Sequence, residues 1–316
     1  MDVLVTGGAG FIGSNLCRRL RAEPSVGRVM ALDDLSTGFA SNLHGVDGVE
    51  FVNGSILDPE VLGPLVANVG AVVHLAARPS VPRSVAEPGL SYLVNVQGTF
   101  NVLEAVRTTN DQAQVIFASS SSVYGANPEL PKHEGLATIP RSPYAASKLA
   151  GEGFVVAYGQ SYGIATLPFR FFNVYGPRQM AGHAYAAVVP AFLRAALRGE
   201  ALPVHGDGTQ TRDFTAVGTV ADVITNAIVR RVSSPAAVNL AFGSRHSLSD
   251  LVSMLATQLG TPLTTETLPV RVGDVPHSQA ANERLRALFP DVTPVNLHEG
   301  LAKTVTWAQA EPDFVS

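Results

Sequence analysis

A glycine loop between a short apolar run and a helical pattern constrains this chain more than any other feature. Residues 3–13 read VLVTGGAGFIG, and residues 14–21 have the spacing of an amphipathic helix. Glycines let a backbone approach phosphate closely, and a helix start presents free N–H groups, so this unit is typical of a pyrophosphate site. The residues that we expect to contact a dinucleotide here are Gly7, Gly10, Phe11, Ile12 and Gly13.

An acidic residue after the second apolar run indicates which dinucleotide is bound. Asp33 ends the run 29–32 and lies 20 residues after Gly13. A carboxylate at this place accepts hydrogen bonds from ribose hydroxyls and repels a 2′-phosphate. No arginine occurs in 32–41 to bind such a phosphate. The sequence therefore favours NAD over NADP, with a turn-capping role for Asp33 and Asp34 as the alternative.

The alternation of apolar runs and helical stretches predicts the fold class. The expected strands are 3–6, 29–32, 50–52, 71–76, 115–118, 165–169 and 238–241. The expected helices are 14–21, 59–69, 90–108, 143–162, 188–198, 219–231 and 248–259. Because the first strands are apolar throughout, we predict a Rossmann-type doubly wound parallel sheet with helices on both faces. We expect 1–171 plus about 214–241 to form this NAD-binding domain. We expect about 172–213 plus 242–316 to form a smaller mixed α/β C-terminal substrate domain.

Composition excludes several classes of protein. The chain has 316 residues, of which 46% are hydrophobic and 15% charged, so a large core is expected. A net charge of −4 gives no reason to expect nucleic acid or a membrane as a partner. The single cysteine, Cys17, excludes an internal disulfide and fits a reducing compartment. With no signal peptide before the first strand and no metal-ligand pattern, we expect a cytoplasmic protein without a metal site.

A tyrosine and a lysine follow the fifth expected strand. Ser142 and Pro143 are a typical N-cap and first helical residue, and Tyr144 and Lys148 then lie on one helix face. An ammonium near a phenol lowers the pKa of the phenol, which can then accept a proton near neutral pH. This spacing alone is common on protein surfaces, so its weight comes from its place after the strand that ends in the serine run 119–122.

Taken together, these motifs resemble the extended short-chain dehydrogenase/reductase family, in its nucleotide-sugar epimerase and dehydratase group. The matching segments are GGAGFIGS, ALDDLSTG, HLAA at 74–77, NVQGTFNVLEA at 95–105, the serine run, YAASK and FRFFNVYGPR at 169–178. GDGTQTRDF at 206–214 and RVGD at 271–274 extend the resemblance to about Ala281.

The resemblance implies a role for each matching position. Tyr144 would take the sugar O4 proton while hydride leaves C4, and Lys148 would bind the nicotinamide ribose and tune Tyr144. Ser120, four residues before Tyr124, matches the catalytic serine or threonine and would also contact substrate. The further implied cofactor contacts are Ser55, Ile56, Ala76 and Asn95, with Ser55 in place of the usual acid. The further implied substrate contacts are Ser80, Asn173, Val188, Arg212, Arg271, Asp274 and Ser278.

One departure from the family pattern bears on the reaction, and two resemblances bear on the substrate. The 4,6-dehydratases that the chain resembles have an Asp-Glu pair where this chain has Ser121 and Ser122, and serine is a poor acid or base for removing water. This favours 4-epimerisation of a UDP-hexose through a transient 4-keto sugar. The small Ser278, seven residues after Arg271, and the segment 184–190 resemble features of N-acetylhexosamine epimerases. We therefore expect a UDP-N-acetylhexosamine such as UDP-GlcNAc.

Two other functions stay open at this point. A dehydratase of the 4,6-type or an unusual 5,6-type would begin with the same C4 oxidation, and the unusual segment 216–220 keeps that alternative. A non-catalytic NAD-binding regulator is disfavoured because the chain retains Tyr144, Lys148 and Ser120. Since both reactions return the hydride within one turnover, NAD should stay tightly bound. The resemblance also implies a homodimer through the helices near 90–108 and 143–162.

Overall fold

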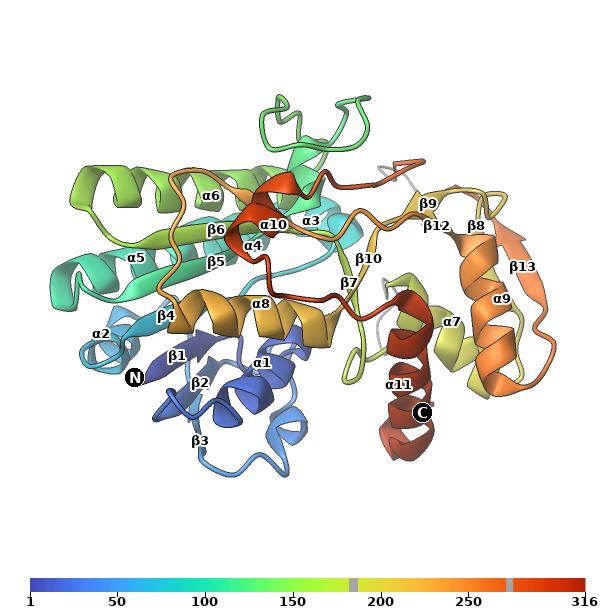
Figure 1. Cartoon of the computed structure of the whole chain (residues 1–316), viewed down its shortest axis with the longest axis horizontal. Coiled ribbons are helices and arrows are strands. Elements are labelled where there is room, and N and C mark those ends of the chain that lie inside the picture. The colour runs from blue at the N-terminus through green and yellow to red at the C-terminus, as the bar shows by residue number, and fades with distance from the viewer. Residues whose placement is uncertain (182–186, 271–274, 316) are drawn as a thin grey trace.

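Seven parallel strands form the central sheet of the molecule (Figure 1). The structure is a computed structural model and describes residues 1–181, 187–270 and 275–315. The strands are β1 (Val3–Thr6), β2 (Val29–Asp33), β3 (Val49–Asn53), β4 (Ala71–His74), β5 (Gln114–Ser120), β6 (Thr166–Phe171) and β11 (Val238–Leu240). Their order across the sheet is β11-β6-β5-β4-β1-β2-β3, and each neighbouring pair is parallel. The predicted doubly wound sheet is confirmed.

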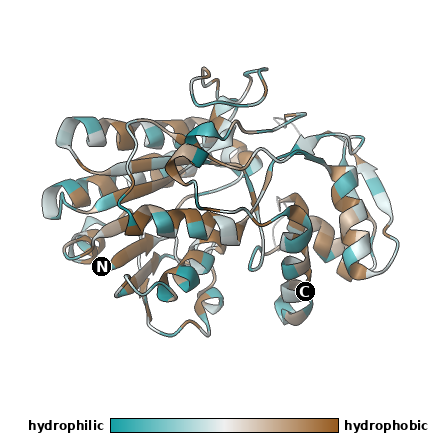
Figure 2. Cartoon of the chain, viewed as in Figure 1, coloured by the Kyte–Doolittle hydropathy of each residue, from teal (hydrophilic) through white to brown (hydrophobic). Residues whose placement is uncertain are grey.

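Helices cover both faces of this sheet. On one face lie α1 (Phe11–Arg21), α8 (Val217–Val229) and α10 (Glu283–Leu288); on the other lie α2 (Pro59–Val66), α5 (Gly98–Thr109) and α6 (Pro143–Tyr162). Alternation along β1 divides its side chains, with Val3 and Val5 packed beside α1 and Leu4 in the opposite layer. Hydrophobic residues predominate along the central strands, and the helices carry both hydrophobic and hydrophilic residues (Figure 2). Each fully buried leucine, such as Leu16, contributes about 1.5–3 kcal/mol.

A smaller mixed α/β unit with its own core lies beside the sheet (Figure 1). It contains the parallel pair β8 (Leu202–His205) and β13 (Thr265–Leu268), with α7 (Val188–Leu197), α9 (Leu248–Leu259) and α11 (Leu297–Ala310). Two short pairs join the units: β7 (Asn173–Tyr175) with β10 (Phe214–Ala216), and β9 (Thr211–Arg212) with β12 (His246–Ser247). The predicted smaller α/β domain is confirmed.

The expected helix 90–108 is present as one continuous helical stretch that contains a π-helical turn. Its segments are α4 (Pro88–Tyr92), the π-helical turn η2 (Leu93–Gln97) and α5. Other short helices are α3 (Val81–Ala86), η1 (Ala40–Leu43), η3 (Ser121–Tyr124) and η4 (Pro312–Phe314). A π-turn within a helix often occurs at a functional site, because it re-aims the side chains it carries. Here it carries Asn95.

The two cores depart from the expected ranges in two places, the first being Phe214 and Ala216, which pack in the core of the smaller unit although they lie within 214–241. Leu285 and Phe289 pack in the core of the large sheet, beside α8 and β11, although they lie within the range 242–316 expected for the substrate domain. We propose that α10 belongs with the sheet domain, and that 297–315 belongs with the smaller unit. Within the described ranges, the search for helices of sufficient length and apolarity to cross a membrane found none.

Candidate active site

The glycine loop closes tightly at the end of β1. Gly7 has a φ of 73°, which L side chains rarely adopt, and its N–H donates to the Leu32 carbonyl at 2.8 Å. A Cβ on Gly13 would lie 2.1 Å from the Gly7 oxygen, so only glycine lets α1 approach the loop this closely. The first turn of α1 contains no acidic residue, and Gly10 makes no side-chain cap. The N–H groups of this helix start are therefore available to a phosphate, which fits a dinucleotide.

Asp33 lies at the end of β2 beside this loop. Its Oδ2 accepts the Ala9 N–H at 3.0 Å, and its Oδ1 accepts the Leu35 N–H at 2.9 Å. Burial raises the pKa of Asp33, and these two backbone hydrogen bonds oppose the rise. A carboxylate has about four lone-pair sites, so two remain for hydroxyl groups of a ligand. Asp33 thus holds the loop and turn, as the capping alternative expects, and also lines the cavity described next.

A cavity of about 590 Å³ follows the carboxyl ends of the strands, where ligands of such sheets bind. The predicted residues that line it are Gly7, Gly10, Phe11, Ile12, Gly13, Asp33, Ile56, Ala76, Ser80, Ser120, Tyr144 and Lys148. An adjoining cavity of about 210 Å³ shares Val174, Gln179 and Ala187 with it. The predicted residues that line the second cavity are Asn173, Val188 and Arg212. The geometry therefore joins a dinucleotide-sized site to a second site that contains an arginine.

Helix α6 brings Tyr144 and Lys148 to the larger cavity. The Ser142 hydroxyl accepts the Ala145 N–H at 3.1 Å and so starts the helix, as the sequence predicts. Lys148 is 3% exposed, and its ammonium donates to the Ala118 carbonyl at 2.9 Å. Burial lowers the pKa of Lys148 to about 8. The lysine is thus held against the end of β5.

The Tyr144 phenol does not have the lowered pKa that the sequence predicts. Burial raises the pKa of Tyr144, and the Ser120 hydroxyl acts in the opposite direction. Desolvation penalises a phenolate, while a hydrogen bond donated to that phenolate stabilises it. Ser120 is therefore the group that favours the proton-accepting form of Tyr144, whereas Lys148 bonds to the Ala118 carbonyl.

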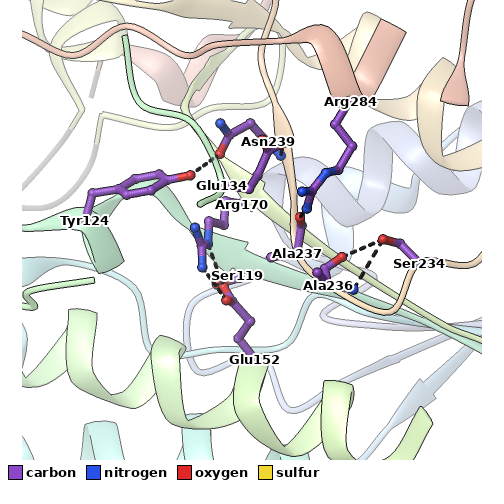
Figure 3. A network of polar contacts seen from close by, with 10 residues as sticks. All are labelled: Ser119, Tyr124, Glu134, Glu152, Arg170, Ser234, Ala236, Ala237, Asn239 and Arg284. Carbon is purple, nitrogen blue, oxygen red and sulfur yellow. Dashed lines mark hydrogen bonds and ion pairs between the residues drawn. The ribbon is translucent and has the colours of Figure 1, made fainter. Parts of the chain in front are cut away.

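A buried ion pair fixes α6 against the sheet (Figure 3). Glu152 Oε1 lies 2.7 Å from Arg170 Nη2, and both side chains are 7% exposed. Ser119 donates to Glu152 Oε2 at 2.6 Å. The Arg170 guanidinium also lies over the Tyr124 ring at 4.7 Å, and the Tyr124 hydroxyl donates to Asn239 Oδ1 at 2.7 Å. This chain of contacts links α6, β5, β6 and β11 behind the cavity wall.

Asn95 supports the cavity from behind. It is 1% exposed, and its Oδ1 accepts the Arg78 N–H at 2.7 Å. Its Nδ2 donates to the Ser147 hydroxyl at 2.9 Å, which in turn donates to the Tyr144 carbonyl at 2.8 Å. The asparagine thereby ties the loop after β4 to the helix turn that carries Tyr144. A contact of Asn95 with the cofactor stays a prediction.

His74 completes the support of the same loop. Thr99 donates to the Asn95 carbonyl at 2.7 Å, so its oxygen accepts from His74 Nε2 at 3.0 Å. We therefore assign the Nε2–H tautomer, in which His74 Nδ1 accepts from Thr6 Oγ1 at 2.7 Å. Burial lowers the pKa of His74 to about 3, so the ring is neutral. The Thr6 oxygen in turn accepts the Ala76 N–H at 3.3 Å.

Several residues differ from the sequence prediction in their placement. Within the described part of the chain, the residues lining the two cavities do not include Ser55, Asn95 or Ser278. Arg271 and Asp274 lie outside the described residues. Lining residues that the sequence analysis did not single out include Thr37, Pro79, Val81, Arg83, Phe171, Phe172 and Gln179. For Phe171 and Phe172 a signal was present, because both lie in the quoted motif FRFFNVYGPR.

Comparison with known proteins identifies the family of the chain. The model of the "NAD dependent epimerase/dehydratase family" matches residues 3–241. The UDP-glucose 4-epimerase of Mycolicibacterium smegmatis is 40% identical over 96% of this chain and 97% of that protein. Among solved structures, the UDP-N-acetylglucosamine 4-epimerase of Methanobrevibacter ruminantium, in complex with UDP-N-acetylmuramic acid, has a TM-score of 0.91 and 34% identity, covering 98% of each chain.

A dehydratase is also among the similar structures. DesIV, the dTDP-glucose 4,6-dehydratase of Streptomyces venezuelae with NAD bound, has a TM-score of 0.90 and 31% identity, covering 98% of each chain. The family match and the bound NAD of such neighbours confirm the resemblance and the expected cofactor. The chain belongs to the NAD-dependent epimerase/dehydratase family.

Proposed function

We propose that this protein is a nucleotide-sugar 4-epimerase that acts on a UDP-hexose, with a UDP-N-acetylhexosamine as its substrate. One observation carries the proposal: Tyr144, Lys148 and Ser120 line the cavity that the glycine loop begins, and this cavity adjoins the one that contains Arg212. Arginine binds phosphate through its planar pair of donors. A sugar between a phosphate at Arg212 and a dinucleotide at the loop would lie beside Tyr144.

The chemistry follows from these residues. Bound NAD supplies a hydride acceptor. Tyr144 takes the proton of the sugar O4 as general base, and Ser120 donates a hydrogen bond that favours the phenolate. The Lys148 ammonium holds its place through the Ala118 carbonyl and keeps a positive charge near the cofactor ribose. Bound NAD would accept the C4 hydride and later return it to the opposite face of the keto sugar, and Tyr144 would give its proton back to O4 to complete the 4-epimer.

The turn after Ser120 favours epimerisation over loss of water. Ser121 and Ser122 begin the short helix η3, at the places where the dehydratases that the chain resembles have an Asp-Glu pair. Neither serine can protonate a leaving hydroxyl and then accept a proton from carbon at neutral pH. A dehydratase of the 4,6- or 5,6-type is the second candidate, because DesIV has a TM-score of 0.90 with this chain.

Product analysis tests the proposal. The purified protein is incubated with UDP-GlcNAc and, in parallel, with UDP-glucose, and the products are examined by mass spectrometry and proton NMR. We expect an isomer of unchanged mass with an inverted C4 proton, formed faster from UDP-GlcNAc. A product lighter by one water would establish the dehydratase instead. Faster turnover of UDP-glucose would be consistent with the proposed 4-epimerase reaction but would contradict the proposed preference for a UDP-N-acetylhexosamine.

We also propose a homodimer that forms through α5 and α6. Large apolar side chains remain exposed near these helices, among them Leu93 at 42%, Phe154 at 38% and Tyr162 at 53%. A second copy would cover these side chains. Light scattering after size exclusion should give twice the chain mass, and Phe154→Glu should shift the measured mass toward that of the monomer.

As in the sequence expectation, we propose that the protein acts in the cytoplasm and keeps NAD bound through purification.

A further inference from the structure

The four serines at the end of β5 differ in the hydrogen bonds that their hydroxyls make. Ser119 donates to Glu152 behind the cavity wall. Ser122 approaches Ser120 twice: its N–H lies 3.2 Å and its hydroxyl 2.9 Å from Ser120 Oγ. Within the described residues, the Ser121 hydroxyl has no hydrogen bond. Only one serine of the run therefore acts directly on the proposed catalytic hydroxyl.

These two contacts determine which further hydrogen bonds the Ser120 hydroxyl can make. A hydroxyl oxygen has two lone pairs and one proton. Both lone pairs of the Ser120 oxygen face donors from Ser122. Ser120 can therefore make a further hydrogen bond only by donating its own proton. Ser120 and Tyr144 line the same cavity. We propose that Ser122 is a positioning residue that holds the Ser120 hydroxyl as a donor toward Tyr144.

The inference rests on the catalytic role proposed above for Ser120, and it must be separated from simple turn formation. A serine commonly accepts an N–H two residues ahead, which is a local turn motif. Ser122→Ala keeps that N–H and with it the η3 turn, but it removes the 2.9 Å hydroxyl contact. The substitution therefore distinguishes a positioning role from a structural one.

The expected effect lies in turnover and in its pH dependence. Loss of one hydrogen bond of ordinary strength should lower kcat by about three- to tenfold while KM for the UDP-sugar stays nearly constant. The proton acceptor is the Tyr144 phenolate, so kcat rises as pH passes through the pKa of Tyr144. A less well oriented Ser120 stabilises the phenolate less and raises that pKa. The acid limb of the kcat profile should therefore move to higher pH in Ser122→Ala.

Matched variants make the result specific. Ser122→Thr keeps a hydroxyl at the same atom position and should restore most of the turnover and the original pH limb. Ser121→Ala removes a neighbouring hydroxyl without a hydrogen bond and should leave both unchanged. A pH limb that moves equally in Ser121→Ala and Ser122→Ala would overturn the proposal, because the cause would then be the turn as a whole.

A double variant shows whether Ser122 acts through Ser120. Ser120→Ala should lower kcat strongly, and adding Ser122→Ala to it should have no further effect. An additional loss equal to that of Ser122→Ala alone would contradict the inference. If Ser120→Ala itself keeps normal turnover, the proposed catalytic role of Ser120 fails. If Ser120→Ala is impaired and Ser122→Ala is not, only the positioning role fails.

A spectroscopic titration gives a readout that does not depend on turnover. The phenolate absorbance of Tyr144 is obtained as the difference between each protein and the same protein carrying Tyr144→Phe. The midpoint of this difference should lie at higher pH in Ser122→Ala than in the unsubstituted protein. Identical midpoints in the two proteins would show that the Ser122 hydroxyl does not act on Tyr144.

Discussion

Glu152 and Arg170 form an ion pair at 2.7 Å in which both side chains are 7% exposed. Glu152 lies one helical turn after Lys148, and Arg170 lies on β6, so the pair connects the helix of the proposed catalytic residues to the sheet. Ser119, the residue before the proposed catalytic serine, donates to the same carboxylate. The Glu152 carboxylate therefore joins α6 to the end of β5, in addition to the hydrogen bond from Lys148 to the Ala118 carbonyl.

Removing that charge should destabilise the protein strongly. Glu152→Gln leaves the Arg170 guanidinium buried without a counter-charge, which costs about 3–5 kcal/mol. Urea unfolding should show this loss in the free energy of unfolding.

Arg198→Ala is the control, because its 3.7 Å contact with Glu200 joins side chains that are 40% and 60% exposed. That change should cost about 0.5 kcal/mol or less. Equal losses in both variants would mean that the buried pair does not stabilise the fold.

His74 should make the stability of the protein depend on pH. Its pKa is about 3 in the folded protein, against 6.5 for an unperturbed histidine. Between these values the unfolded chain binds a proton that the folded chain does not, so stability falls as pH decreases below 6.5. The loss between pH 7 and pH 5 is about 2 kcal/mol.

The variant His74→Gln isolates this contribution. Glutamine is neutral at each pH, and its amide can donate toward Thr99 and accept from Thr6. Urea unfolding at pH 7 and pH 5 should show a pH dependence that is about 2 kcal/mol smaller in the variant. Parallel pH profiles in the two proteins would mean that His74 binds its proton at the same pH whether folded or unfolded.

Sequence alone predicted most of the large domain, because its signals are local. The strand β1 is buried throughout, and α6 begins at the capping Ser142 and ends before Gly163, whose φ of 72° suits the end of a helix. The parts that sequence missed depend on distant partners. β7 forms only by pairing with β10, about forty residues later, and Arg170 occurs in an apolar strand that gives no local sign of Glu152.

Part of the residues that line the proposed site could be predicted from the sequence, but their interactions could not. Tyr144 and Lys148 follow from a motif, and both line the cavity. The predicted effect of Lys148 on the phenol was wrong, because spacing along a helix does not reveal the burial of Tyr144 or the Ala118 carbonyl that binds the ammonium. Likewise, the amide of Asn95 is directed by a π-helical turn that no sequence pattern indicates.

Replacing the proposed base should abolish turnover but not cofactor binding. Tyr144→Phe keeps the ring and removes the proton acceptor, so kcat should fall by about 10²- to 10⁴-fold. The NAD content per chain, measured after acid release, should stay the same. Tyr162→Phe, which removes an exposed hydroxyl at the other end of α6, should have normal turnover. A Tyr144→Phe protein with turnover near normal would remove Tyr144 from the mechanism.

The glycine loop can be tested through a single methyl group. A Cβ at position 13 would lie 2.1 Å from the Gly7 oxygen, which also accepts the Gly10 N–H at 3.1 Å. Gly13→Ala must therefore displace the turn that precedes α1, and we expect the purified variant to contain little or no NAD. Gly153→Ala is the matched control, because a Cβ there meets no atom within 4 Å on the outer side of α6. It should keep its NAD, with stability unchanged or higher by about 0.4–1 kcal/mol. If folded Gly13→Ala keeps a full complement of NAD, this loop is not where the dinucleotide is held.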